Sequence, residues 1–108
     1  MSYNIKTISV FEKQARRLSR KYPSLKKDLL HLVSLLKQNP ETGSSLGGNC
    51  YKIRMSVSSK SKGKSGGARI ITHIIVAYKN VYLLSIYDKS EKADLASGEL
   101  KQLLKEII

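Results

Sequence analysis

The chain has no carboxylate between Glu41 and Asp88, although it carries many cations in that stretch. These cations are Lys52, Arg54, Lys60, Lys62, Lys64, Arg69 and Lys79. Cations without acidic neighbours favour an anionic partner, and nucleic acid is the commonest large anion in a cell. The alternative is that the net charge of +12 only keeps a small protein in solution. It fits less well because the charge is distributed so unevenly along the chain.

Cysteine and long apolar runs are also scarce. Cys50 is the only cysteine, so no internal disulfide can form and a reducing compartment is expected. No apolar run approaches the ~20 residues that span a bilayer, and the N-terminal residues lack the apolar stretch of a secretory signal. We therefore expect a cytoplasmic protein that does not bind membranes.

Residues that would hold a metal or a cofactor are lacking as well. The two histidines, His31 and His73, are isolated, and no HxxxH or CxxC spacing occurs. The run Gly63-Lys64-Ser65 lacks the earlier glycine of a phosphate-binding loop and precedes a strand pattern rather than a helix pattern. We expect no metal and no cofactor.

The first half of the chain predicts a strand followed by two helices. With 108 residues, the chain fits a single domain over residues 1–108. A short strand is predicted over residues 3–8 and a helix from Ser9 to Tyr22. Proline at position 23 starts a second, leucine-rich helix, which ends at Asn39 and Pro40. Residues 43–49 are expected to form a turn-rich connection.

The second half changes from a helical period to a strand period. Apolar and cationic residues alternate over residues 51–55, which predicts a half-buried strand. Residues 58–67 have the composition of a loop, whereas residues 68–78 and 81–87 predict a hairpin and Ser97 begins a last helix. The predicted fold is α+β: a small antiparallel sheet in the order β-α-α-β-β-β-α, with helices packed on one side.

Strand alternation predicts a cationic face on this sheet. Lys52 and Arg54 point away from the apolar residues of their strand, and Tyr87 and Lys89 share a face of the last strand. In an antiparallel sheet these side chains and Arg69 converge on one surface. The alternative is that they are solvated residues on an exposed sheet face.

The predicted surface has residue types that suit chemistry on RNA. Arginine stabilises the charge that develops on a phosphate during in-line attack. A lysine crowded by other cations loses its proton more readily and can act as a base. A tyrosine can stack on a base or donate a proton. This chemistry requires neither a metal nor a histidine.

Three segments carry a resemblance to a known family: CYKIR at residues 50–54, KGKSGGARII at residues 62–71 and LSIYDKSE at residues 84–91. In order and spacing the chain resembles the RelE/ParE superfamily of bacterial toxins, and most of all its HigB branch. The resemblance implies a RelE-like fold and a ribosome-dependent endoribonuclease. In that activity the ribose 2′-OH of mRNA in the ribosomal A site attacks the adjacent phosphate.

The resemblance also implies roles for individual residues. Lys52 or Arg54 acts as base and electrostatic support, Arg69 as phosphate clamp, and Lys89 as acid or second clamp. The base-stacking tyrosine of RelE-type members is replaced by Leu95, and Tyr87 is expected to take its place. The basic loop with Lys60, Lys62 and Lys64 is expected to contact RNA phosphates.

The expected partners are mRNA, ribosomal RNA and a cognate antitoxin protein with acidic segments. Two other functions fit the same fold. One is a ParE-like inhibitor of DNA gyrase, and the other is an RNA-binding member without catalysis. The complete cationic series favours the ribonuclease.

Overall fold

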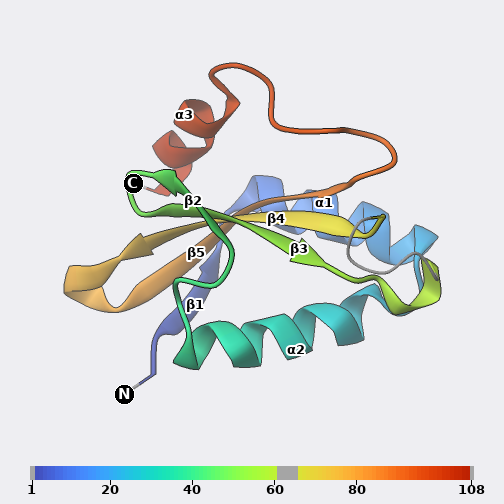
Figure 1. Ribbon diagram of the computed structural model, residues 1–108, viewed down its shortest axis with the longest axis horizontal. Coiled ribbons are helices and arrows are strands. Elements are labelled where there is room, and N and C mark those ends of the chain that lie inside the picture. The colour runs from blue at the N-terminus through green and yellow to red at the C-terminus, as the bar shows by residue number, and fades with distance from the viewer. Residues whose placement is uncertain (1, 61–65, 108) are drawn as a thin grey trace.

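The structure is a computed structural model that describes residues 2–60 and 66–107. Its centre is a five-stranded sheet in the order β1-β5-β4-β3-β2 (Figure 1). β1 pairs parallel to β5, and the remaining pairs are antiparallel. The strands are β1 (Asn4–Thr7), β2 (Ser44–Gly47), β3 (Cys50–Met55), β4 (Ala68–Ile75) and β5 (Asn80–Asp88). The predicted α+β class is confirmed.

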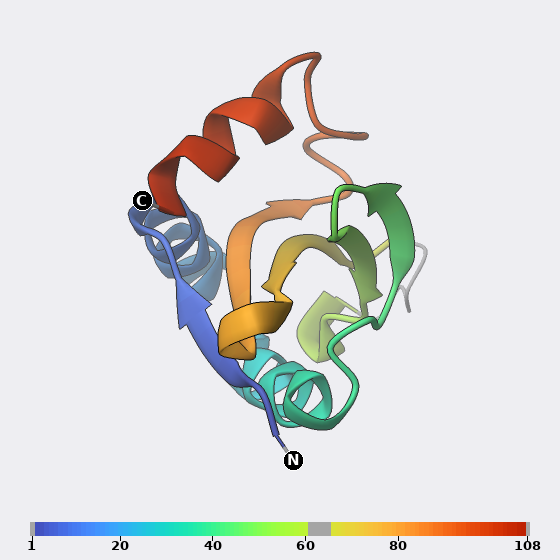
Figure 2. The ribbon, with the colours of Figure 1, turned by 90° about the vertical axis from the view of Figure 1, so that its left-hand side faces the viewer.

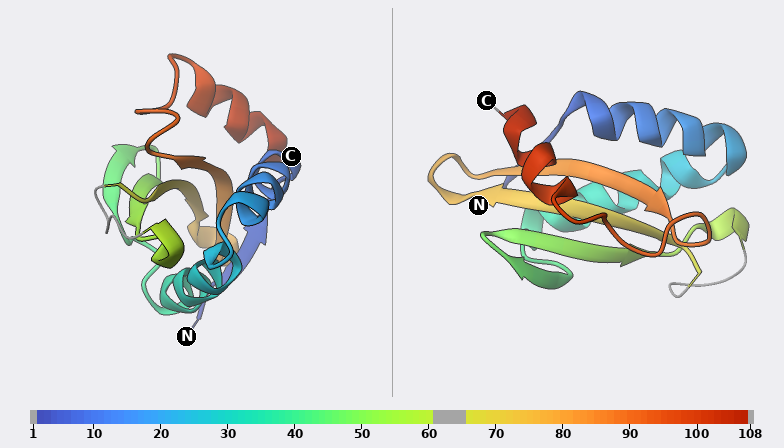
Figure 3. Two further views of the ribbon diagram at one scale, coloured as in Figure 1. Left: turned by 90° about the vertical axis from the view of Figure 1, so that its right-hand side faces the viewer. Right: turned by 90° about the horizontal axis from the view of Figure 1, so that it is seen from above.

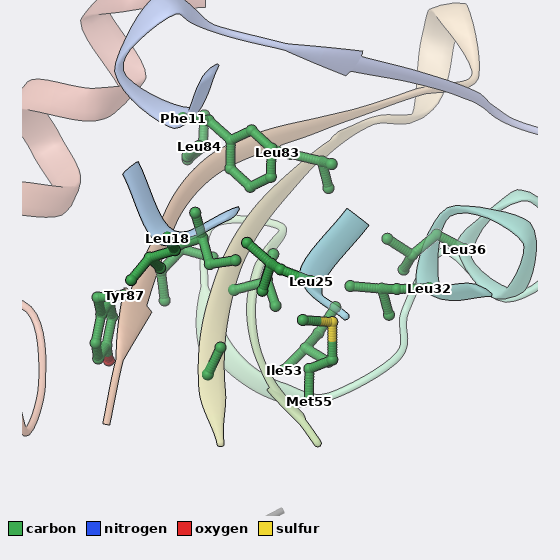
Figure 4. Close-up of a cluster of buried hydrophobic side chains, with 14 of the residues drawn as sticks. Phe11, Leu18, Leu25, Leu32, Leu36, Ile53, Met55, Leu83, Leu84 and Tyr87 are labelled. Atoms are coloured by element: carbon green, nitrogen blue, oxygen red, sulfur yellow. The ribbon is translucent and has the colours of Figure 1, made fainter. Parts of the chain in front are cut away.

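Two helices, α1 (Ser9–Lys21) and α2 (Leu25–Gln38), form a hairpin against one side of the sheet (Figures 1 and 2). α1 ends where Tyr22 donates its backbone N–H to the carbonyl of Leu18, and Pro23 separates it from α2. The buried leucines of α2 recur on one face, which packs onto Ile53 and Met55 of β3 (Figure 4). This packing forms the main core.

The edge of β5 is completed by a side chain once β1 ends. The parallel pairing of β1 and β5 ends at Thr7 and Leu83. Beyond that point, Oε1 of Gln14 in α1 accepts the backbone N–H of Ile86 at 3.0 Å and the hydroxyl of Ser85 at 3.1 Å. Gln14 therefore takes the place of a strand and fixes the end of β5, from which Tyr87 extends.

A β-bulge changes the face that β5 presents. Ile71 pairs with Ser85 but Thr72 pairs with Leu83, so Leu84 is an extra residue on β5. Figure 4 shows that Leu83 and Tyr87 point to opposite sides of the strand. Without the bulge, strict alternation would place both side chains on the same face. The bulge therefore places Tyr87 on the opposite face of β5 from Leu83, although both side chains are buried.

The structure differs from the predicted fold in several places, and one of them is that β1 pairs parallel rather than antiparallel. Residues 43–49, which were predicted as a connection, include the exposed strand β2. This strand has no apolar pattern and forms because it pairs with β3. The 3-10 turn Val76–Tyr78 replaces the end of the expected strand, since β4 ends at Ile75. The last helix, α3 (Glu99–Leu104), begins two residues after Ser97, and Gly98 is its N-cap.

α3 also lies on the other side of the sheet from α2 (Figures 2 and 3). The prediction that the helices pack on one side is therefore right only for α1 and α2. Leu103 of α3 is buried, and Leu100 and Leu104 pack with it against the core. Among the described residues, no helix is long and apolar enough to cross a membrane.

Candidate functional site

Three predicted site residues lie side by side across the sheet. Arg54 of β3 pairs with Arg69 of β4, and Arg69 pairs with Tyr87 of β5. Because neighbouring strands are about 4.8 Å apart, this row spans roughly 10 Å. Lys52 lies two residues before Arg54 and therefore on the same face of β3. The structure thus brings four of the predicted site residues onto one surface.

The two arginines of this row differ in their surroundings. Arg54 is exposed, and no described residue forms an ion pair or hydrogen bond with its side chain. Arg69 is only 5% exposed, and its Nη1 donates to the carbonyl of Ala68 at 3.2 Å. Arg69 is therefore held in place by the sheet, whereas Arg54 is open to an incoming anion.

Tyr87 places a protonated hydroxyl beside these cations. Burial raises the pKa of Tyr87 to about 12, and the charge of Asp94 and its hydrogen bond with the phenol act in the same direction. The nearby charge of Arg69 opposes them. The hydroxyl, which donates to Oδ1 of Asp94 at 3.3 Å, therefore keeps its proton at neutral pH and is a donor.

Asp94 is a site residue that the sequence analysis missed. Its carboxylate lies 3.3 Å from Nζ of Lys52 and accepts the backbone N–H of Leu95 at 2.8 Å. The Leu95 N–H and then the Lys52 ammonium lower the pKa of Asp94. Asp94 belongs to an irregular segment between β5 and α3, so no periodicity relates it to the sheet residues that it contacts.

Lys89 does not join the row of Arg54, Arg69 and Tyr87. Its ammonium donates to the carbonyl of Ala93 at 3.0 Å, and no described contact links it to the other candidate residues. Leu95, which stands where RelE-type members carry a base-stacking tyrosine, packs against the hydrophobic core. The structure therefore places Lys89 and Leu95 at the margin of the surface.

Lys60 lies in an internal ion pair rather than in an exposed loop. Its Nζ is 2.6 Å from Oδ1 of Asp88, and its side chain is 7% exposed. Burial opposes the ionisation of Asp88, but hydrogen bonds from Lys60, Tyr22 and Ser90 hold the pKa of this carboxyl well below its usual range. This geometry does not suit a phosphate contact by Lys60. Lys62 and Lys64 lie outside the described residues.

Cys50 and His73 have a structural environment. Sγ of the buried Cys50 is 3.3 Å from Nδ1 of His73 on the paired strand. Burial raises the pKa of the Cys50 thiol, so it remains protonated at neutral pH. Within residues 2–60 and 66–107, no group of three or more histidine, cysteine, aspartate or glutamate side chains is arranged to hold a metal ion.

The fold and this surface define a class of protein: a small, strongly basic α+β protein whose sheet carries Lys52, Arg54 and Arg69 beside a protonated tyrosine. Residues 8–107 match the model of the family described as the RelE toxin of the RelE/RelB toxin–antitoxin system. The chain therefore belongs to the RelE toxin family.

Solved structures share this fold. A double arginine-to-alanine mutant of Escherichia coli toxin RelE in the free state is 20% identical, with all of both chains covered and a TM-score of 0.66. The same mutant in complex with an antitoxin RelBc peptide is 21% identical over all of both chains, with a TM-score of 0.51. The Mycobacterium tuberculosis RelBE2 complex is 13% identical, with 82% of this chain and 99% of that chain covered and a TM-score of 0.57.

Proposed function

We propose that this protein is the toxin of a toxin–antitoxin module and a ribosome-dependent mRNA endoribonuclease. The observation that supports it is the row of Arg54, Arg69 and Tyr87 across three strands, with Lys52 on the same face. Such a surface provides the charges and the proton donor that cleavage through the 2′-OH requires.

The proposed reaction uses the side chains of this surface as follows. The 2′-oxygen forms a bond to phosphorus and gives up its proton, while the bond from phosphorus to the 5′-oxygen breaks. The proton acceptor is Lys52 in its neutral amine form, because a guanidinium cannot be deprotonated in a protein. The products are a cyclic 2′,3′-phosphate and a 5′-hydroxyl.

The remaining residues stabilise the charge and supply a proton. Arg54 and Arg69 bind the phosphate oxygens, on which negative charge develops in the transition state. Tyr87, which is protonated at neutral pH, donates to the departing 5′-oxygen. Lys62 and Lys64 remain predicted phosphate contacts, and Lys89 a predicted second clamp at the margin.

Primer extension on an mRNA in a cell-free translation system tests this proposal. We expect cuts within translated codons that disappear when ribosomes are left out. Arg54→Ala should lower the cleavage rate by about 10²-fold or more, the cost of losing one donor that stabilises a transition state. Arg20→Ala removes an equally exposed arginine from α1 and should leave cleavage intact.

Other outcomes would contradict the proposal in distinct ways. Cuts that persist without ribosomes would mean that the protein is a ribonuclease whose activity does not depend on the ribosome. No cuts at any protein concentration would refute the nuclease, and inhibition of DNA supercoiling would then indicate a ParE-like gyrase inhibitor.

The proposal includes a protein partner. The net charge of +12 and the similarity to a RelE–RelBc complex favour an antitoxin with acidic segments. Co-expression of the neighbouring reading frame should restore growth to cells that produce the toxin. Action on ribosomes would place the protein in the cytoplasm. The HigB-like branch stays a prediction from the three quoted segments, since the matching family model is that of RelE.

A further inference from the structure

One carboxylate lies among the cations of the candidate site. Asp94 is in the connecting segment, residues 89–98, which joins β5 to α3 and crosses in front of the sheet (Figure 3, right). Among the described residues, no other acidic side chain has an ion pair or hydrogen bond with Lys52, Arg54 or Tyr87.

The Asp94 carboxylate engages donors that an RNA phosphate would need. Oδ1 and Oδ2 each lie 3.3 Å from Nζ of Lys52, and Oδ1 accepts the hydroxyl of Tyr87 at 3.3 Å. Carboxylates and phosphates use the same kind of cationic and hydroxyl donors. A phosphate cannot reach both groups while the carboxylate lies between them.

Asp94 is held weakly, although the connecting segment is anchored on both sides of it. The Asp94 side chain is 63% exposed, and exposed ion pairs contribute little to stability. Before it, Glu91 pairs with Arg17 of α1 at 2.7 Å. Lys92 of the same segment pairs with Glu99, the first residue of α3, at 2.7 Å. Rotation of the Asp94 side chain alone can therefore uncover Lys52 and Tyr87.

We propose that the Asp94 carboxylate competes with an RNA phosphate for the same donors. It covers Lys52 and Tyr87 in the free protein and is displaced when RNA binds. This inference rests on the proposed function, because it takes the same surface as the RNA site. It gives the free toxin a lower affinity for RNA than its cations alone would produce. RNA presented in a fixed position, as on a ribosome, compensates for that lower affinity through a high local concentration.

The test measures the affinity for a single-stranded, fully 2′-O-methylated RNA without ribosomes, by fluorescence anisotropy at fixed salt. This RNA cannot be cut, so the result does not depend on whether the protein is a nuclease. Asp94→Asn should bind about two- to fivefold more tightly, the range expected for an exposed ion pair that no longer has to be broken. Glu41→Gln removes an exposed charge that has no ion pair among the described residues, and should change affinity much less.

A second pair of variants tests whether the gain comes through Lys52, because the amide oxygen of asparagine can still accept the Tyr87 hydroxyl. When Lys52 is first replaced by methionine, the further change Asp94→Asn should give no more gain than Glu41→Gln does. Three results would overturn the inference: no gain or weaker binding in Asp94→Asn, an equal gain in Glu41→Gln, or a full gain without Lys52. If the protein does not cleave mRNA but Asp94→Asn still binds RNA more tightly, the proposed nuclease activity is refuted and the proposed competition by Asp94 is supported.

Discussion

Tyr87 and Asp94 are seven residues apart in the chain, but their side chains meet over the sheet. The contact affects both groups, because an anion beside a phenol opposes the formation of a second anion. A tyrosine that donates a proton to a leaving group must be protonated when substrate arrives, and the pKa of about 12 ensures this. Burial and Asp94 together therefore keep the proton on Tyr87, and Asp94 also occupies its hydrogen bond.

The pKa of Tyr87 tests this contact directly. In Asp94→Asn, we expect that pKa to fall below about 12 but to stay above the ordinary value of ~10, since burial persists. The measurement is a ¹³Cζ NMR titration of labelled tyrosine, with the signal assigned by Tyr87→Phe. Glu41→Gln is the control. An unchanged pKa in Asp94→Asn would show that the two side chains do not meet in solution.

At the scale of elements, Asp88 joins three parts of the fold. It ends β5 and accepts hydrogen bonds from Tyr22 after α1, at 2.5 Å, and from Lys60 of the 3-10 turn Ser58–Lys60, at 2.6 Å. Its side chain is fully buried. Removing one member of a buried ion pair costs ~3–5 kcal/mol because the other charge is left without compensation.

We therefore predict that Asp88→Asn lowers the free energy of unfolding by about 3 kcal/mol at pH 7, since asparagine keeps part of the hydrogen bonding. The pKa of Asp88 is lowered in the folded state, so its contribution is present above the unfolded value of ~3.9 and is lost as pH falls below it. Urea unfolding at pH 7 and pH 3 measures both effects.

Comparing wild type with Asp88→Asn separates the pH dependence of stability that is due to Asp88 from that of the other carboxylates. The stability gap between wild type and Asp88→Asn should be constant from pH 7 to about pH 5 and should shrink towards pH 3. Glu106→Gln, an exposed change, should show no gap. A gap of equal size at pH 3 and pH 7 would mean that the charge of Asp88 does not stabilise the fold.

The elements that sequence could predict are those whose residues alternate or repeat. The leucine stripe of α2 and the alternation of β3 each bury one face, so the pattern reflects the packing. β2 carries no such pattern because it is exposed and is formed by pairing alone. Lys52 and Arg54 followed from alternation, whereas the side on which Tyr87 lies depends on the bulge at Leu84, which alternation does not indicate.

Asp94 and Lys60 could not be predicted for a related reason. Asp94 belongs to an irregular segment and Lys60 to a short 3-10 turn, and in both cases long-range contacts decide which charged groups the side chain meets. The Lys/Gly/Ser-rich composition of the loop predicts that its cations are exposed. The ammonium of Lys60 instead lies over the ring of Tyr22 and pairs with Asp88. Composition therefore indicates the sign of the surface charge, and only the fold decides which charges are neutralised.

Over the whole molecule, the fold uses much of its scarce negative charge internally. Of the eight acidic residues, Asp88, Glu91, Asp94 and Glu99 form ion pairs with cations of the fold. Arg17 and Lys21 of the α1–α2 hairpin pair with Glu91, whereas several other exposed cations of the hairpin have no ion pair among the described residues: Lys13, Arg16, Arg20, Lys26, Lys27 and Lys37. The protein therefore has two basic surfaces, one on the sheet and one on the hairpin.

The salt dependence of RNA binding distinguishes these two surfaces. For a single strand, the logarithm of the affinity falls with the logarithm of salt concentration with a slope of about −0.7 per neutralised phosphate. If RNA lies on the sheet face, Arg54→Ala should make the slope less steep by about 0.7, and Arg20→Ala should leave it unchanged. The measurement uses the 2′-O-methylated RNA over a series of salt concentrations. Equal changes in both variants would mean that RNA is held by the overall charge of +12, and that the row of Arg54, Arg69 and Tyr87 gives it no fixed place.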